Sequence, residues 1–175
     1  MILVVSLCAE KMHDLEFVRP VCALLQKLQV KFQVVHYSHV SSVPTVEAVI
    51  LCGTSLADFE YLRGDFSWLL NYSGKVLGIC AGAQVLCRAF GGKLIDFQSI
   101  GKYLLRREKP FFDLLEEFFV YALHAKGVEL PSMFETVARS DAGIEMFKSN
   151  DGKKIGMLFH PEVLNSEMIE KFVML

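Results

Sequence analysis

The stretch "GICAGAQVL", residues 78–86, sets a cysteine between an apolar run and a helical pattern. A strand that turns sharply into a helix strains the residue at the turn, and small neighbours leave room for it. Gly78 and Gly82 supply that room around Cys80. The positive end of a helix lowers the pKa of a thiol, so a cysteine at such a turn is an activated nucleophile. The alternative is an ordinary turn that contains a buried cysteine.

The runs of apolar residues around this stretch indicate a parallel sheet. Five runs are bounded by turn signals, at residues 2–7, 31–36, 47–52, 75–80 and 154–160. Runs that are apolar on both faces suit strands buried between two helical layers. Helical patterns lie between them, and this alternation predicts right-handed crossovers. We therefore expect an α/β fold with a three-layer, doubly wound, mostly parallel and flavodoxin-like sheet.

The first helical pattern carries apolar residues at a spacing of three and four, behind Asp14 as a possible N-cap. The stripe consists of Leu15, Val18, Cys22, Leu25 and Leu28. Pro20 interrupts it, because a proline inside a helix removes a hydrogen bond. The helix either kinks at Pro20 or begins there.

From about residue 93 to residue 147 the pattern changes to short apolar stretches, which predict a small antiparallel addition to the sheet. Within it, "PFFDLLEE" (110–117) is expected to form a short helix. "SNDG" (149–152) is expected to form a hairpin turn.

Length and composition limit the remaining possibilities. The 175 residues are expected to form one domain, 1–175. Lys and Arg total 18 against 20 Asp and Glu, and the basic residues are scattered, which argues against nucleic acid as a ligand. No apolar segment reaches the length of a membrane span, and the first residues predict a strand and not a signal peptide, so a cytoplasmic protein is expected. Five cysteines without a CxxC pair predict reduced thiols, with no metal site.

A nucleophile needs a base, and "FHPE" (159–162) offers one. His160 ends an apolar strand, and Pro161 stiffens the backbone between it and Glu162. A carboxylate held two residues from an imidazole can accept its N–H and orient the ring. Three-residue motifs have low specificity, and a plain turn after a strand is the other interpretation.

Taken together, "GICAGAQVL" and the late "LFHPE" resemble the class I (triad) glutamine amidotransferases. The resemblance implies that Cys80 is the nucleophile, His160 the general acid and base, and Glu162 the residue that orients it. It also implies that Gln84 contacts the bound glutamine. "CGTSLAD" (52–58) matches the family's oxyanion loop, so the resemblance assigns the Gly53 and Ala81 N–H groups to the oxyanion and Thr54 to substrate binding. No cofactor is implied.

The implied reaction converts L-glutamine to glutamate and ammonia through a γ-glutamyl thioester. Residues 120–148 resemble the glutaminase part of GMP synthase, so the implied partner is a separate synthetase subunit, with the ATP pyrophosphatase of GMP synthase as first candidate. Three segments depart from that pattern: "LHAK" (123–126) replaces Ser-His-Gly-Asp, Leu158 replaces Gln, and "CGTS" replaces "SGGP". His124 is a candidate for supporting the partner interface.

Two other functions remain open at this stage. A PfpI-type peptidase or deglycase shares "ICAG", but its acid would be Glu10 or Glu16, and it leaves Gln84 and "HPE" unexplained. A catalytically silent regulatory module could keep the fold without the activity. Some other residues are expected in the core or an interface: Cys87, Trp68 and the Phe pairs at 111–112 and 118–119.

Overall fold

A computed structural model describes all residues, 1–175, and shows nine strands in one continuous sheet. The strand order is β2-β1-β3-β4-β9-β8-β7-β5-β6. Five strands are parallel and lie side by side: β2 (Phe32–His36), β1 (Ile2–Ser6), β3 (Ala48–Leu51), β4 (Lys75–Ile79) and β9 (Lys154–Met157). They correspond to the five apolar runs of the sequence.

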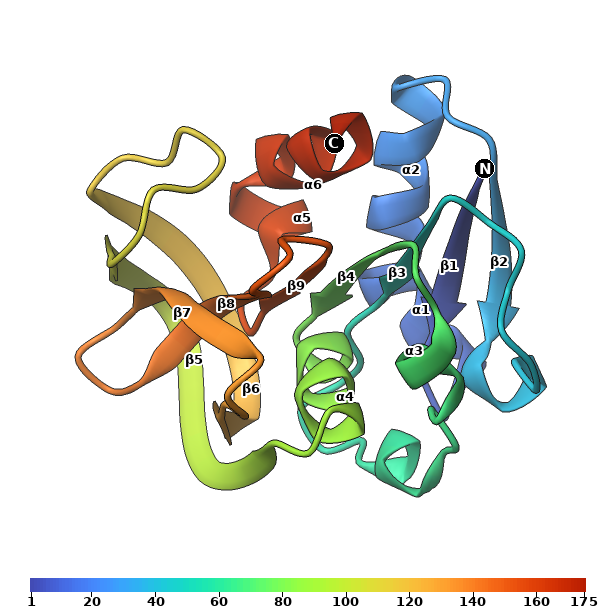
Figure 1. The fold of residues 1–175 in the computed structure, drawn as a ribbon, viewed down its shortest axis with the longest axis horizontal. Helices are drawn as coiled ribbons and strands as arrows, with labels where there is room; N and C mark the ends of the chain where they lie inside the picture. Colours follow the sequence, from blue (N-terminus) through green and yellow to red (C-terminus); the bar gives the residue numbers. More distant parts are fainter.

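The other four strands are antiparallel and continue the sheet beyond β9 (Figure 1). They are β5 (Lys93–Arg107), β6 (Glu117–Glu129), β7 (Phe134–Arg139) and β8 (Ile144–Ser149). The first of them, β5, is a single long strand. A register shift between Asp96 and Ser99 bends it.

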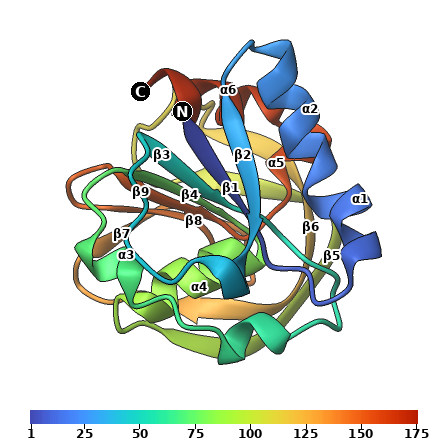
Figure 2. The ribbon, with the colours of Figure 1, turned by 90° about the vertical axis from the view of Figure 1, so that its right-hand side faces the viewer.

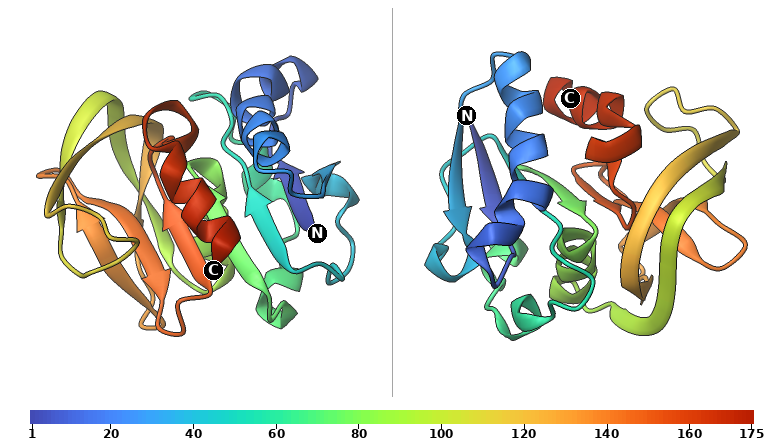
Figure 3. Two further views of the ribbon diagram at one scale, coloured as in Figure 1. Left: turned by 90° about the horizontal axis from the view of Figure 1, so that it is seen from above. Right: turned by 180° about the vertical axis from the view of Figure 1, so that it is seen from behind.

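Helices cover both faces of the parallel strands and give the expected three layers (Figures 2 and 3). One face packs against α1 (Asp14–Phe17), α2 (Arg19–Lys27) and α6 (Ser166–Met174); the other packs against α3 (Trp68–Asn71) and α4 (Ala81–Ala89). The short α5 (Pro161–Leu164) precedes α6. Each face has its own buried apolar cluster, and Val4 and Val5 of β1 belong to opposite clusters. This alternation explains why the strands read as continuous apolar runs.

The first helical pattern forms two helices that meet at Val18. Pro20 lies in the first turn of α2, where its missing N–H has no helical partner to lose. Asp14 is the first residue of α1 and not its N-cap, which is His13, and its carboxylate accepts a hydrogen bond from the Ser6 hydroxyl. Leu15 is 55% exposed, so its place in the buried stripe was predicted wrongly.

The short helix expected at residues 110–117 is also absent. Phe112 and Asp113 both have positive φ angles, 52° and 53°, which a right-handed helix excludes. The turn at 149–152 does join β8 and β9 as a hairpin, with Gly152 at φ 73°. None of the helices combines the length and the apolar character that a bilayer span requires.

Candidate active site

Cys80 stands between β4 and α4, where the chain reverses sharply. Its φ is 50° and its ψ is −109°, a strained conformation for a residue with a side chain. A Cβ on Gly78 would lie 2.5 Å from the Gly82 oxygen, and one on Gly82 would lie 2.1 Å from the Leu51 oxygen. Both glycines are therefore needed for α4 to pack so closely on β3 and β4.

The strain at Cys80 predicts a stability difference. Glycine adopts positive φ without steric cost, so Cys80→Gly is expected to unfold with a free energy about 1 kcal/mol higher than Cys80→Ala. Cys87, inside α4, is the matched control, because glycine there is expected to cost about 1 kcal/mol relative to alanine. Urea unfolding of the four variants measures both differences. Equal stability of the two Cys80 variants would mean that the turn is unstrained.

His160 and Glu162 form a buried pair at the end of β9. The distance from His160 Nδ1 to Glu162 Oε1 is 2.7 Å, and the two side chains are 2% and 1% exposed. The backbone N–H of His160 donates to the Tyr121 carbonyl of β6, and this hydrogen bond fixes the position of His160 at the edge of the sheet. The Phe17 ring packs against the imidazole, with the centroids 5.6 Å apart. His160 is therefore held by a carboxylate, a strand and an aromatic ring.

The Gly53 backbone brings the thiol and the imidazole together. A Cβ placed on Gly53 would lie 2.9 Å from His160 Cε1 and 3.3 Å from Cys80 Cβ. The strand pairing also places Cys80 near His160, because β4 pairs with β9 and the Cys80 N–H donates to the Met157 carbonyl at 2.7 Å. Residues that are 80 positions apart in the sequence thus share one corner of the sheet.

The electrostatics of this corner favour a charged imidazole. Burial lowers the pKa of His160, but the neighbouring Cys80 and Glu162 outweigh it and hold that pKa well above its usual value. His160 Nε2 has no hydrogen-bond partner, and Cys80 Sγ lies 3.4 Å from the Leu123 carbonyl oxygen. The imidazole nitrogen that faces away from Glu162 is thus free to give up a proton and to take one back.

The other four cysteines lie in environments that disfavour a thiolate. Burial raises the pKa of Cys8 to about 11 and that of Cys87 to about 11. It also raises the pKa values of Cys22 and Cys52. All five thiols are free, and Cys87 lies in the core as predicted. These four thiols are therefore poor nucleophiles at neutral pH.

A small pocket with a volume of about 10 Å³ adjoins Cys80. Of the predicted site residues, Thr54, Ala81 and Gln84 also line it. Ala81 is the first residue of α4, where an N–H has no partner within the helix. The Thr54 hydroxyl donates to Asp58 at 2.7 Å, so its remaining capacity is as an acceptor. The pocket and the Cys80 corner thus contain every residue that the sequence pattern selected.

Several pocket residues were missed at the sequence level. Asp58 accepts hydrogen bonds from Thr54 and from the Ala9 N–H, and so ties the 52–58 loop to the end of β1. Tyr61 donates to the Gln84 side chain. Asp58 is the last residue of the quoted "CGTSLAD" segment, so the motif could have identified it. Tyr61 lies in a short 3₁₀ turn, where no pattern in the sequence marks it.

The unusual "LHAK" segment has a structural explanation. His124 Nε2 lies 3.1 Å from Glu145 Oε2 with both side chains fully buried, so His124 itself is not on the surface, and its support of a partner interface stays a prediction. Lys126 forms an ion pair with Asp96, and its ammonium lies 5.5 Å from the Phe59 ring centroid.

Leu158 is fully buried in the core. Trp68 and Phe118 are also buried, but Phe119 is 50% exposed.

A family model for class-I glutamine amidotransferases matches residues 12–174. The chain belongs to this family. Among curated proteins of the family, it is 32% identical over 135 residues to a glutamine-hydrolyzing GMP synthase subunit of Methanococcus maripaludis, covering 73% of this chain and 70% of the relative. It is 29% identical over 164 residues to the glutamine-hydrolyzing GMP synthase of Thermotoga maritima, covering 90% of this chain but 32% of that longer protein.

Solved structures of glutamine amidotransferases share the fold. A protein described as a GMP synthase subunit, from Thermoplasma acidophilum, superposes with a TM-score of 0.84 at 20% identity, over 99% of this chain and 92% of that one. A glutamine amidotransferase from Thermotoga maritima gives a TM-score of 0.68 at 18% identity, over 99% and 81%. The mixed sheet with helices on both faces is thus the family fold.

Proposed function

We propose that this amidotransferase is a glutaminase subunit that hydrolyses L-glutamine to glutamate and ammonia. The observation that carries the proposal is the strained Cys80 at the start of α4, set beside His160 at Gly53. A thiolate beside an imidazolium is ready to attack an amide carbon. The buried Glu162 holds the imidazole in one orientation.

The proposed reaction has two stages. Cys80 Sγ attacks the side-chain amide carbon of glutamine, and the N–H groups of Gly53 and Ala81 stabilise the negative oxygen of the tetrahedral intermediate. His160 gives a proton to the departing nitrogen, which leaves as ammonia, and a γ-glutamyl thioester remains. Water deprotonated by His160 then attacks the thioester, and glutamate and the free thiol are released. Thr54 and Gln84 bind the substrate from the pocket wall.

We further propose that the ammonia passes to a separate synthetase subunit, the ATP pyrophosphatase of GMP synthase, in the cytoplasm. The names of the archaeal relatives support this assignment. An exposed apolar surface next to the site supports a docking partner: Val163 and Leu164 follow Glu162 and are 61% and 46% exposed. Phe119 lies beside them, because its carbonyl accepts from the Asn165 amide at 3.1 Å.

The partner assignment predicts that the chain co-elutes with the guanylate-forming ATP pyrophosphatase in gel filtration and that glutamate release rises when that protein is added. Val163→Ser/Leu164→Ser is expected to weaken co-elution, because it removes apolar area from the surface. Leu70→Ser, also strongly exposed but on α3, is the control. Glutamine hydrolysis without any association would leave the glutaminase proposal standing and exclude this partner.

A further inference from the structure

Gln84 lies one helical turn after Cys80, so both side chains face the same pocket. It is 2% exposed, and its amide is held at both ends. Nε2 donates to the Lys126 carbonyl of β6 at 3.0 Å, while Oε1 accepts the Tyr61 hydroxyl. Since a backbone carbonyl can only accept, the Lys126 contact identifies the amide nitrogen and leaves the oxygen facing Tyr61.

An amide side chain has two N–H groups and two lone pairs on its oxygen. The Tyr61 and Lys126 contacts use one N–H and one lone pair of Gln84. One donor and one acceptor remain, in the wall of a pocket that Cys80 also lines. A ligand that carries both acceptors and donors, such as the amino acid head or the amide of glutamine, can use them together.

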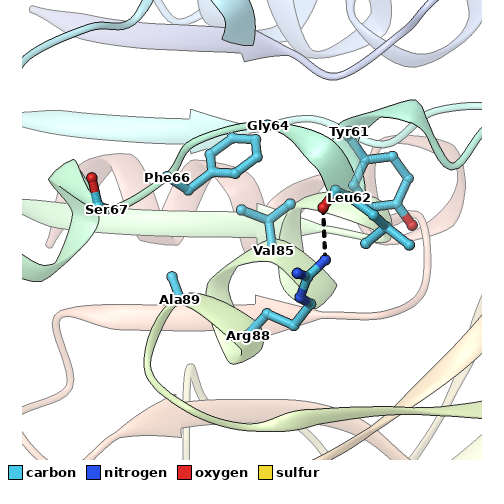
Figure 4. A pocket seen from close by; sticks show the side chains of 8 residues that line it. All are labelled: Tyr61, Leu62, Gly64, Phe66, Ser67, Val85, Arg88 and Ala89. Carbon is cyan, nitrogen blue, oxygen red and sulfur yellow. Dashed lines mark hydrogen bonds between the residues drawn. The ribbon is translucent and has the colours of Figure 1, made fainter.

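Tyr61 is suited to fix this arrangement. It lies in the 3₁₀ turn Glu60–Arg63 and is 2% exposed. Burial, with smaller contributions from the nearby Cys80 and Asp58, raises the pKa of Tyr61, so the hydroxyl remains a donor at neutral pH. Its ring forms part of a second pocket on the outer side, lined also by Phe66, Val85 and Arg88. Figure 4 shows the hydroxyl pointing away from that second pocket.

We infer that Tyr61 is a positioning residue for substrate recognition: its hydroxyl locks the Gln84 amide in the one orientation that presents a donor and an acceptor to glutamine. Without this hydroxyl the Gln84 oxygen is buried without a partner, and the side chain can turn away from the pocket. Chemistry at Cys80 involves neither group. The inference rests on the proposed glutaminase function and adds a determinant of substrate affinity to it.

The test compares Tyr61→Phe with the unmodified protein in glutamine hydrolysis, with the synthetase present if it is needed for activity. The KM for glutamine is expected to rise about tenfold, and kcat is expected to stay within about threefold, since one hydrogen bond in recognition is lost. Tyr72→Phe is the matched control: Tyr72 is a buried tyrosine whose hydroxyl donates to the Val46 carbonyl, away from the pocket. Its KM is expected to be unchanged.

A double-mutant cycle separates positioning from a general loss of packing. In a Gln84→Met background, Tyr61→Phe is expected to have no further effect on KM, because Tyr61 acts through the Gln84 amide. A tenfold rise that persists in that background contradicts the inference, as does an unchanged KM in the single variant. Thermal unfolding of each variant identifies any loss of fold.

A labelling experiment keeps this inference distinct from the proposed function. Iodoacetamide, which is too small to need Gln84, is expected to alkylate Cys80 at the same rate in the unmodified protein and in Tyr61→Phe. A glutamine-mimicking diazoketone is expected to require about tenfold higher concentration for half-maximal labelling of the variant. If the diazoketone fails to label the unmodified protein, the glutaminase proposal itself fails. If it labels both proteins equally, only the role of Tyr61 is excluded.

Discussion

Cys80→Ala is expected to lower the rate of glutamine hydrolysis by about four orders of magnitude or more, with and without a synthetase. The thioester cannot form without the sulfur, and removal of a nucleophile that acts with its base removes nearly all of the catalysis that the group provides. Glutamate release in a coupled assay measures the loss. Because alanine keeps the backbone strain, the variant is expected to fold as the unmodified protein does.

Cys87→Ala is the matched control for this substitution. Cys87 is a buried thiol of the same helix, two turns beyond Cys80, and its raised pKa keeps it protonated at neutral pH. Its replacement is expected to leave the rate within about threefold of normal. Mass spectrometry after treatment with the glutamine-mimicking electrophile is expected to find the label on Cys80 alone. Hydrolysis that continues in Cys80→Ala would exclude the thioester mechanism.

Glu162→Gln is expected to lower kcat/KM for glutamine about a thousandfold, although it changes the side chain by one atom. The carboxylate accepts the Nδ1 proton of His160 and raises its pKa; an amide lacks the charge and can favour the wrong tautomer. The pair is nearly solvent-free, with side chains 2% and 1% exposed, so water cannot replace the lost charge. Steady-state kinetics measure the effect, with exposed Glu167→Gln on α6 as control.

The same variant predicts a change in pH dependence with a definite sign. His160 must carry its proton to release ammonia, so the activity falls as the pH rises through its pKa. Cys80 and Glu162 together hold that pKa well above its usual value, against the opposing effect of burial. Loss of the charge therefore lowers the pKa, and the high-pH limb of the kcat/KM profile is expected to move to lower pH. A limb that stays in place, or moves upward, would mean that Glu162 does not act on His160.

The parallel strands and the triad candidates could be predicted from the sequence because each depends on a local sequence pattern. The five buried strands are apolar on both faces, and the glycines around Cys80 are required by contacts of 2.5 Å or less that any side chain would make. His160 and Glu162 are linked by a rigid proline. At these positions the residue types alone indicate the local structure.

Other features depend on tertiary contacts that no local pattern reveals. The segment 110–117 has helical spacing, but Phe112 and Asp113 adopt positive φ angles while Lys171 donates to the Phe112 carbonyl from α6. The His124–Glu145 pair joins strands that are 21 residues apart in sequence. Tyr61 reaches Gln84 from a loop. In each case a partner distant in the chain decides the outcome, and local propensity is overridden.

The pairing of β4 with β9 determines when a newly made chain can become active. During translation the turn that contains Cys80 is made first, whereas β9 and the His160 that follows it are made only after the whole antiparallel segment. Long-range parallel pairing forms slowly, because a large loop must close first. In a partly translated polypeptide the Cys80 thiol therefore has no catalytic base, and no ammonia is released before β9 has joined the sheet.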